Sequence, residues 1–226
     1  MTIHDVQAIG LEVSGGGLSA SPIVIRDVVI ARLGPRAAGI VLSPGVAATR
    51  ELLIHRCRLS GPLATGVRVD TDAGELEIRE CRFDDVETPI LFSAAGQALE
   101  AISIANNTFR RFQQGIRFAG LPQTGSPGIG FQKNLFVSPG GPEVVVDGAA
   151  AASLEGLSQG AAVELNWTEG SSETGGLDIF TDNGRRGIDP VAFAEAEAGD
   201  ADSFLQPRDP QLRSAASGAA NPKYIG

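Results

Sequence analysis

Aromatic side chains, histidine and cysteine are scarce in this chain of 226 residues. It contains one Trp, one Tyr, two His and two Cys. So few cysteines exclude a fold held together by several disulfides, and neither Cys has a His at a matching position, which disfavours a zinc site or a cysteine nucleophile. A groove lined with several Trp and Tyr rings is excluded as well.

Positive charge and long apolar runs are limited too. Lys and Arg number 18 against 27 Asp and Glu, which gives a net charge of -9. Nucleic acids and anionic membrane surfaces attract clustered basic residues, so neither is an expected partner. No apolar run approaches the roughly 20 residues that cross a bilayer, and the first residues lack the basic and apolar stretches of a signal peptide.

The chain is instead rich in a repeated pattern: apolar, any, any, Cys or Asn, any, apolar. Its copies cover residues 25–30, 54–59, 78–83, 104–109, 131–136 and, more loosely, 163–168. After a short polar turn comes a second pattern, usually Gly and then two apolar residues that flank one free position. Copies of the second pattern begin at residues 11, 40, 67, 90, 116, 144 and 177, in steps of 29, 27, 23, 26, 28 and 33 residues.

Units of this length, with short apolar segments that cannot bury a face alone, are typical of a solenoid whose units stack on one another. The sequence therefore predicts an all-β fold: a right-handed parallel β-helix solenoid of about seven turns, with equivalent strands paired ~4.8 Å apart. We expect one elongated domain, with repeats over residues 1–180 and a C-terminal cap over residues 181–226. Asp189-Pro190 ahead of Val191 to Glu197 predicts a short helix in this cap.

The register of the repeats predicts two columns of side chains. The fourth position of the first pattern is expected to form a hydrogen-bonded ladder at a sharp turn; from the C-terminal end its members are Asn166, Asn134, Asn107, Cys81, Cys57 and Val28. The sixth position is expected to stack inside the coil; its members are Ile30, Leu59, Phe83, Phe109 and Phe136.

Cys57 and Cys81 fall on adjacent turns. We interpret them as buried thiols that occupy ladder positions, because parallel strands do not offer the usual disulfide geometry. A disulfide in an oxidising compartment is the alternative, and the sequence does not decide their redox state. His55 is expected to point outward near the end of a strand, without a role as a ligand or a base.

Charged residues outside the core fit the same register. Asp27, Arg56 and Glu80 precede the ladder on successive turns, so opposite charges should lie next to one another in solvent. Asp84 and Asp85 are interpreted as residues of a solvated turn.

The segment Ile102 to Phe109, followed by Gly115 to Phe118, resembles the right-handed parallel β-helix proteins of the pectate-lyase-like class, with repeats of the carbohydrate-binding-and-hydrolysis type. The likeness covers roughly residues 10–180. That family contains lyases, hydrolases, epimerases, adhesins and proteins without known activity, so the resemblance implies a carbohydrate ligand rather than one reaction. It also implies an extracellular or cell-surface location.

In enzymes of this family the substrate groove runs along the sheet of the Gly-led strands. The polar residues at or just after these strands are expected to line such a groove for an acidic or neutral sugar, with arginines facing any carboxylates of the sugar; they are Arg68, Asp70, Arg117, Asp147 and Asp178. Pectate lyases bind calcium with clustered acidic residues, whereas Asp70 and Asp147 lie three turns apart, ~14 Å. They cannot share an ion, and no close carboxylate pair with a His suits hydrolysis.

The sequence therefore favours a noncatalytic binding or structural module that has no cofactor and is part of a larger protein; no catalytic residue is assigned. Polysaccharide is the ligand that the resemblance implies. One alternative is a polysaccharide lyase, with calcium as its cofactor, or a glycoside hydrolase, acting around Arg68 and Arg117. Another is a protein-interaction scaffold or adhesin. The first turn has no cap in the sequence, so a flanking domain or self-association is expected at the N-terminal end.

Overall fold

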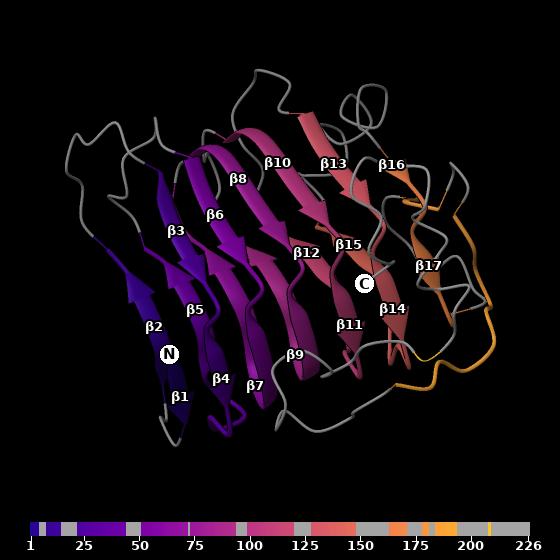
Figure 1. Ribbon diagram of the computed structural model, residues 1–226, viewed down its shortest axis with the longest axis horizontal. Coiled ribbons are helices and arrows are strands. Elements are labelled where there is room, and N and C mark those ends of the chain that lie inside the picture. The colour runs from indigo at the N-terminus through magenta and orange to yellow at the C-terminus, as the bar shows by residue number, and fades with distance from the viewer. Residues whose placement is uncertain are drawn as a thin grey trace.

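Parallel strands form all of the regular structure in the part of the chain that is described. The computed structural model describes residues 1–4, 8–14, 22–43, 51–71, 73–93, 99–119, 128–147, 163–170, 178–180, 184–193 and 208. The strands of each turn pair with the equivalent strands of the next, so the chain winds as a parallel β-helix (Figure 1). The predicted all-β solenoid is confirmed.

The coil has three faces, which we number in chain order. Face 1 is a six-stranded sheet of β3 (Ile23–Arg26), β6 (Glu51–His55), β8 (Ala73–Arg79), β10 (Leu99–Ala105), β13 (Gly128–Gln132) and β16 (Val163–Glu164). An eleven-stranded sheet forms the other two faces. Face 2 contains β1 (Thr2–His4), β4 (Val29–Ala31), β11 (Thr108–Arg110), β14 (Leu135–Val137) and β17 (Trp167–Thr168). Face 3 contains β2 (Ile9–Val13), β5 (Ala38–Leu42), β12 (Ile116–Phe118) and β15 (Val144–Val146), and β7 (Arg58–Val69) and β9 (Arg82–Phe92) run through faces 2 and 3.

The predicted number of turns is wrong. The coil has fewer complete turns than seven. Its first turn contributes only β1 and β2 among the described residues, and the last Gly-led copy does not form a strand at Asp178 and Ile179. Leu177, which begins that copy, lies outside the described residues. Ile179 and Phe180 are nevertheless buried against the core, so this copy closes the coil without extending a sheet.

The predicted helix is also wrong over residues 189–193, which are not helical; residues 194–197 lie outside the described residues. Val191 and Phe193 instead pack with Leu135, Val137 and Trp167 on the outer surface of face 2. Alternating residues reach one surface in an extended segment, so tertiary packing has overridden a local helix signal. No helix among the described residues is long and apolar enough to cross a membrane.

The inward column at the centre of the coil is confirmed. Ile30, Leu59, Phe83, Phe109 and Phe136 are all fully buried. The rings of Phe83 and Phe109 stack with centroids 5.2 Å apart, and those of Phe109 and Phe136 with centroids 4.8 Å apart. These spacings follow the ~4.8 Å separation of paired strands, because each turn repeats the backbone of the one before it.

The asparagine ladder joins consecutive turns at the corner between faces 1 and 2. The Nδ2 of Asn134 donates to Oδ1 of Asn166 at 2.9 Å and to the carbonyl of Ile104 at 2.8 Å. Its own Oδ1 accepts from the backbone N and the Nδ2 of Asn107, both at 3.1 Å. All three ladder asparagines are fully buried. Each amide thus satisfies polar groups of two neighbouring turns, which water cannot reach.

The residue before each ladder position has a left-handed backbone. The φ angles are 55° at Asp27, 51° at Arg56, 53° at Glu80, 54° at Asn106, 56° at Lys133 and 56° at Leu165. A non-glycine residue in this region is unfavourable by roughly 1 to 2 kcal/mol. Stacking of the turns must therefore stabilise this corner, since the local sequence alone does not.

Close contact between turns explains the glycine that leads the second pattern. Gly10, Gly39 and Gly66 lie in register on face 3. A Cβ on Gly39 would lie 2.8 Å from the carbonyl oxygen of Gly66, and one on Gly66 would lie 2.5 Å from that of Pro89. A carbonyl of the next turn therefore occupies the space that a side chain would need.

Replacing Gly66 by alanine tests this contact. The added Cβ would also lie 2.8 Å from a ring carbon of Phe83, so Gly66→Ala should destabilise the protein by about 1 to 3 kcal/mol. Gly34→Ala is the matched control, because a Cβ there meets nothing within 4 Å. Urea unfolding of both variants measures the difference, and equal midpoints would contradict the steric explanation.

Replacing Asn134 tests the ladder. Asn134→Ala leaves buried groups of Asn107, Asn166 and Ile104 without their partners, so unfolding should become easier by at least about 2 kcal/mol. Asn134→Cys should cost less, because the chain already uses cysteine in this column. Denaturant titration measures the free energy of unfolding of both variants. An unchanged value in Asn134→Ala would show that the ladder contributes little to stability.

Candidate functional site

The outward side chains of face 3 form two rows along the coil. The first row consists of Glu12, Val41, Arg68, Leu91, Arg117 and Val145, one from each turn, and Val41 is the one member that is fully buried. The second row follows the ends of the strands and includes Ser43, Asp70, Ser93 and Asp147. Arg68 and Arg117 lie on either side of Leu91, two turns apart, which is about 10 Å at the usual strand spacing.

Arg68 is oriented by a carboxylate on its own strand. Its Nε donates to Oδ2 of Asp70 at 2.7 Å, and the hydroxyl of Ser93 on the next turn donates to Oδ1 of the same carboxylate. The side chain of Arg68 is 37% exposed and that of Asp70 is 19% exposed. The terminal nitrogens of Arg68 make no hydrogen bond with the described residues, so they are free to meet an anion.

Arg117 is held in a similar way from the next turn but with more of its donors engaged. Its Nε and one terminal nitrogen donate to Oδ2 of Asp147 at 3.2 and 2.7 Å, and the other terminal nitrogen donates to Gln114 at 3.3 Å. The side chain remains 36% exposed. Each arginine of face 3 is thus fixed in position by a carboxylate beside it, while part of its surface faces outward.

Asp178 does not join this row. Its carboxylate accepts from Arg186 at 2.9 Å and from the backbone N of Phe180 at 3.0 Å. The structure therefore groups four of the five predicted residues into two ion pairs on face 3 and places the fifth in the segment that follows β17.

The carboxylates of face 3 do not fit the calcium site that a lyase would need. Asp70 and Asp147 are three turns apart, ~14 Å, and each already pairs with an arginine. Among the described residues, no group of three Asp, Glu, His or Cys side chains is arranged to hold a metal ion.

The interpretation of Asp84 as part of a solvated turn is wrong. Asp84 lies in β9 with its side chain 5% exposed, and its carboxylate accepts two hydrogen bonds from Arg110 and two from Arg111. Arg110 in turn lies 5.6 Å from the ring centroid of Phe193. A buried carboxylate needs such partners, so this cluster connects β9 with β11 and with the segment over face 2. Its neighbour Asp85 is exposed, as expected, but also lies within β9.

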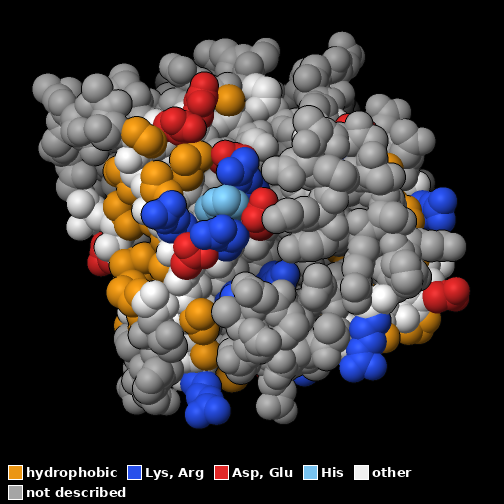
Figure 2. Space-filling model, viewed as in Figure 1, with side chains coloured by type: hydrophobic (Ala, Val, Ile, Leu, Met, Phe, Trp, Pro, Cys, Tyr) orange, Lys and Arg blue, Asp and Glu red, His pale blue; other side chains and the backbone are white. Residues whose placement is uncertain are grey.

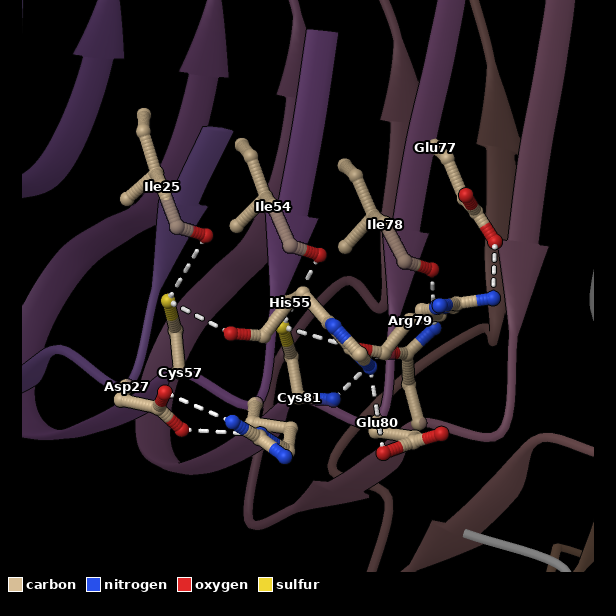
Figure 3. A network of polar contacts seen from close by, with 12 residues as sticks. Ile25, Asp27, Ile54, His55, Cys57, Glu77, Ile78, Arg79, Glu80 and Cys81 are labelled. Atoms are coloured by element: carbon tan, nitrogen blue, oxygen red, sulfur yellow. Dashed lines mark hydrogen bonds and ion pairs between the residues drawn. The ribbon is translucent and has the colours of Figure 1, made fainter. Parts of the chain in front are cut away.

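A second polar cluster lies on the outer surface of face 1. Figure 2 shows basic and acidic side chains around a histidine in front of β3, β6 and β8, with hydrophobic side chains beside them. Its ion pairs join Arg56 to Asp27 at 2.7 Å, His55 to Glu80 at 3.1 Å and Arg79 to Glu77 at 3.1 Å (Figure 3). The expected pairing of Asp27 with Arg56 is confirmed, and the hydrogen bonds from Arg56 lower the pKa of Asp27.

Sequence reasoning missed part of this cluster. Arg26, His55 and Arg79 each stand two residues before a ladder position, so the repeat itself places three basic side chains in one row. Of these three residues, only His55 stands out in the sequence, as one of two histidines. The shared register position was the signal that could have revealed the row.

Cys57 and Cys81 are free and buried, as expected for thiols in the ladder. The thiol of Cys57 donates weakly to the carbonyl of Ile25 at 3.7 Å, and that of Cys81 to Ile54 at 3.5 Å. The amide of Asn107 donates to the equivalent carbonyl, that of Ile78, at 2.9 Å. Figure 3 shows these carbonyls on successive strands of face 1, so each thiol takes the place of one amide donor.

The first turn has neighbours on one side only. Among the described residues, β1 pairs with β4, β2 with β5 and β3 with β6, and no strand lies beyond them. Met1 and Val24, the most exposed of the large hydrophobic residues described, both belong to the first two turns.

Comparisons with protein-family models, with curated proteins and with solved structures each find no match for this chain. The class of protein is therefore defined by the fold alone, as a parallel β-solenoid.

The buried thiols give a chemical test of the ladder. Both side chains are fully buried, so a reagent in solvent does not reach either sulfur in the folded protein. Burial raises the pKa of the Cys81 thiol, whereas the hydrogen bond with the Cys81 side chain lowers the pKa of Cys57, so burial rather than thiolate content protects Cys57. Iodoacetamide should label neither cysteine in the folded protein and both in urea. Mass spectrometry counts the adducts; rapid labelling of a folded thiol would contradict its place in the core.

Proposed function

We propose that this chain is a noncatalytic β-helical module that binds an acidic polysaccharide along face 3. The observation that carries the proposal is the placement of Arg68 and Arg117. They project from one rigid sheet, are about 10 Å apart, and flank the half-buried side chain of Leu91. The resemblance to pectate-lyase-like proteins supports a sugar as the ligand.

The chemistry of the row suits an acidic sugar chain. Guanidinium groups form strong, charge-assisted hydrogen bonds with carboxylates. Because Asp70 and Asp147 fix the two arginines, few side-chain rotamers are lost when a ligand binds. Leu91 offers an apolar surface between the two arginines, against which the C–H groups of a sugar ring can pack.

Local pairing of the polar groups favours binding over catalysis. An enzyme of this kind brings an acid and a base together at one reacting bond, and its site perturbs their pKa values. On face 3, Asp70 and Asp147 are each paired with an arginine and are separated by three turns. They support the arginines and do not converge on a common point.

The proposal includes a neighbour at the first turn. The outer edges of β1, β2 and β3 have no strand partner among the described residues, and an exposed strand edge readily accepts another strand. A flanking domain of a larger protein, or a second copy, would complete this edge without covering face 3.

Binding of polygalacturonate, with neutral dextran as the comparison, tests the proposal. Calorimetry should detect binding of the acidic polymer only, and Arg68→Gln and Arg117→Gln should each weaken it about tenfold, since each removes a charge-assisted contact. Arg36→Gln is the matched control, because Arg36 is exposed and lies in a turn away from the row. Calcium should change neither result.

The same samples test the absence of catalysis. Unsaturated products or new reducing ends that disappear in Arg117→Gln would overturn the noncatalytic part of the proposal. Failure to bind either polymer would overturn the carbohydrate part and leave a protein-interaction scaffold as the better explanation.

A further inference from the structure

Three basic side chains form a row on the outer surface of face 1. Arg26 ends β3, His55 ends β6 and Arg79 ends β8, and the three residues pair in register. Since paired strands lie ~4.8 Å apart, the row spans about 10 Å. The preceding residues, Ile25, Ile54 and Ile78, are buried in the core. Neighbouring residues of a strand point to opposite sides, so the basic row faces outward.

The two outer residues of the row, Arg26 and Arg79, have hydrogen-bond donors that no described residue uses. Arg26 is exposed and makes no ion pair or hydrogen bond with the described residues. Arg79 contacts Glu77 through one terminal nitrogen, and its side chain is 44% exposed. Two guanidinium groups thus stand on either side of the imidazole of His55, which itself contacts Glu80 at 3.1 Å.

The charges around His55 are balanced when its ring is neutral. Arg26, Arg56 and Arg79 face Asp27, Glu77 and Glu80, so the arginines and the carboxylates around the ring are equal in number. The rest of the chain makes the protein strongly acidic, with a net charge of -9. An anion seated between the two outer arginines would be attracted by their guanidinium groups.

An apolar strip borders the row. Val24 and Leu53 occupy the next outward register position of β3 and β6, and Val24 is 47% exposed. Figure 2 shows hydrophobic side chains next to the charged cluster on this surface. We propose that the row Arg26, His55 and Arg79 binds the oxyanion of an organic acid whose hydrocarbon part lies on Val24 and Leu53. This site is on face 1 and is independent of the polysaccharide site proposed on face 3.

Addition of acetate, hexanoate or inorganic sulfate, followed by the NMR signal of the His55 ring, tests the site. His4→Gln assigns the signal, since the chain has only two histidines. All three anions should shift the His55 signal in a saturable way, and hexanoate should bind about tenfold tighter than acetate, because its chain buries apolar surface. Equal affinity for acetate and hexanoate would contradict the part given to Val24 and Leu53.

Arg26→Gln should weaken each anion about tenfold, because it removes the unpaired guanidinium. Arg36→Gln, which changes an exposed arginine in a turn, should leave the affinity unchanged. The proposal fails if the His55 signal does not saturate or if Arg26→Gln binds like Arg36→Gln.

Discussion

The pairing of each turn with the next is the constraint on which the rest of the structure depends. Because successive turns repeat the same backbone ~4.8 Å apart, any side chain at a given register position lies directly over its counterpart. A phenylalanine therefore stacks on a phenylalanine, as in the column of Phe83, Phe109 and Phe136, and an asparagine amide reaches the amides above and below it. An atom added to one turn, such as a Cβ at Gly66, therefore collides with the backbone of the following turn.

The same repetition explains why charges occur in rows on the outside. On face 1 the rows bring Arg56 to Asp27, and on face 3 they bring Arg117 to Asp147. Ion pairs of this exposed kind contribute little to stability, so their main effect is to fix the direction of each side chain. The buried pair of Arg110 and Asp84 differs, because both side chains are largely removed from water and Phe193 of a further segment lies against Arg110. The same repeat geometry thus produces both exposed and buried ion pairs, which differ in how far their side chains are removed from water.

Much of the architecture could be predicted because a short motif recurs at a nearly constant interval. The ladder of Asn107, Asn134 and Asn166 and the inward column followed directly from register. The errors fall where the repeat ends or where a second layer covers it. Val191 and Phe193 look helical in the local sequence, yet they pack in an extended segment over Trp167. Asp84 looks like a turn residue, yet its carboxylate is buried and bonded to Arg110 and Arg111 of the next turn. A local sequence pattern does not show which side chains of another turn will cover a residue.

The sequence by itself determined the strand register, the inward columns and the positions at which charged side chains project, because each depends on spacing that one turn passes to the next. Only the tertiary structure decided which outward residues meet. Arg68 pairs with its own strand neighbour Asp70, Arg117 with Asp147 of the following turn, and Asp178 with Arg186 beyond the last strand. Rotamers and the covering of each face set those choices, and both depend on contacts between segments far apart in the chain.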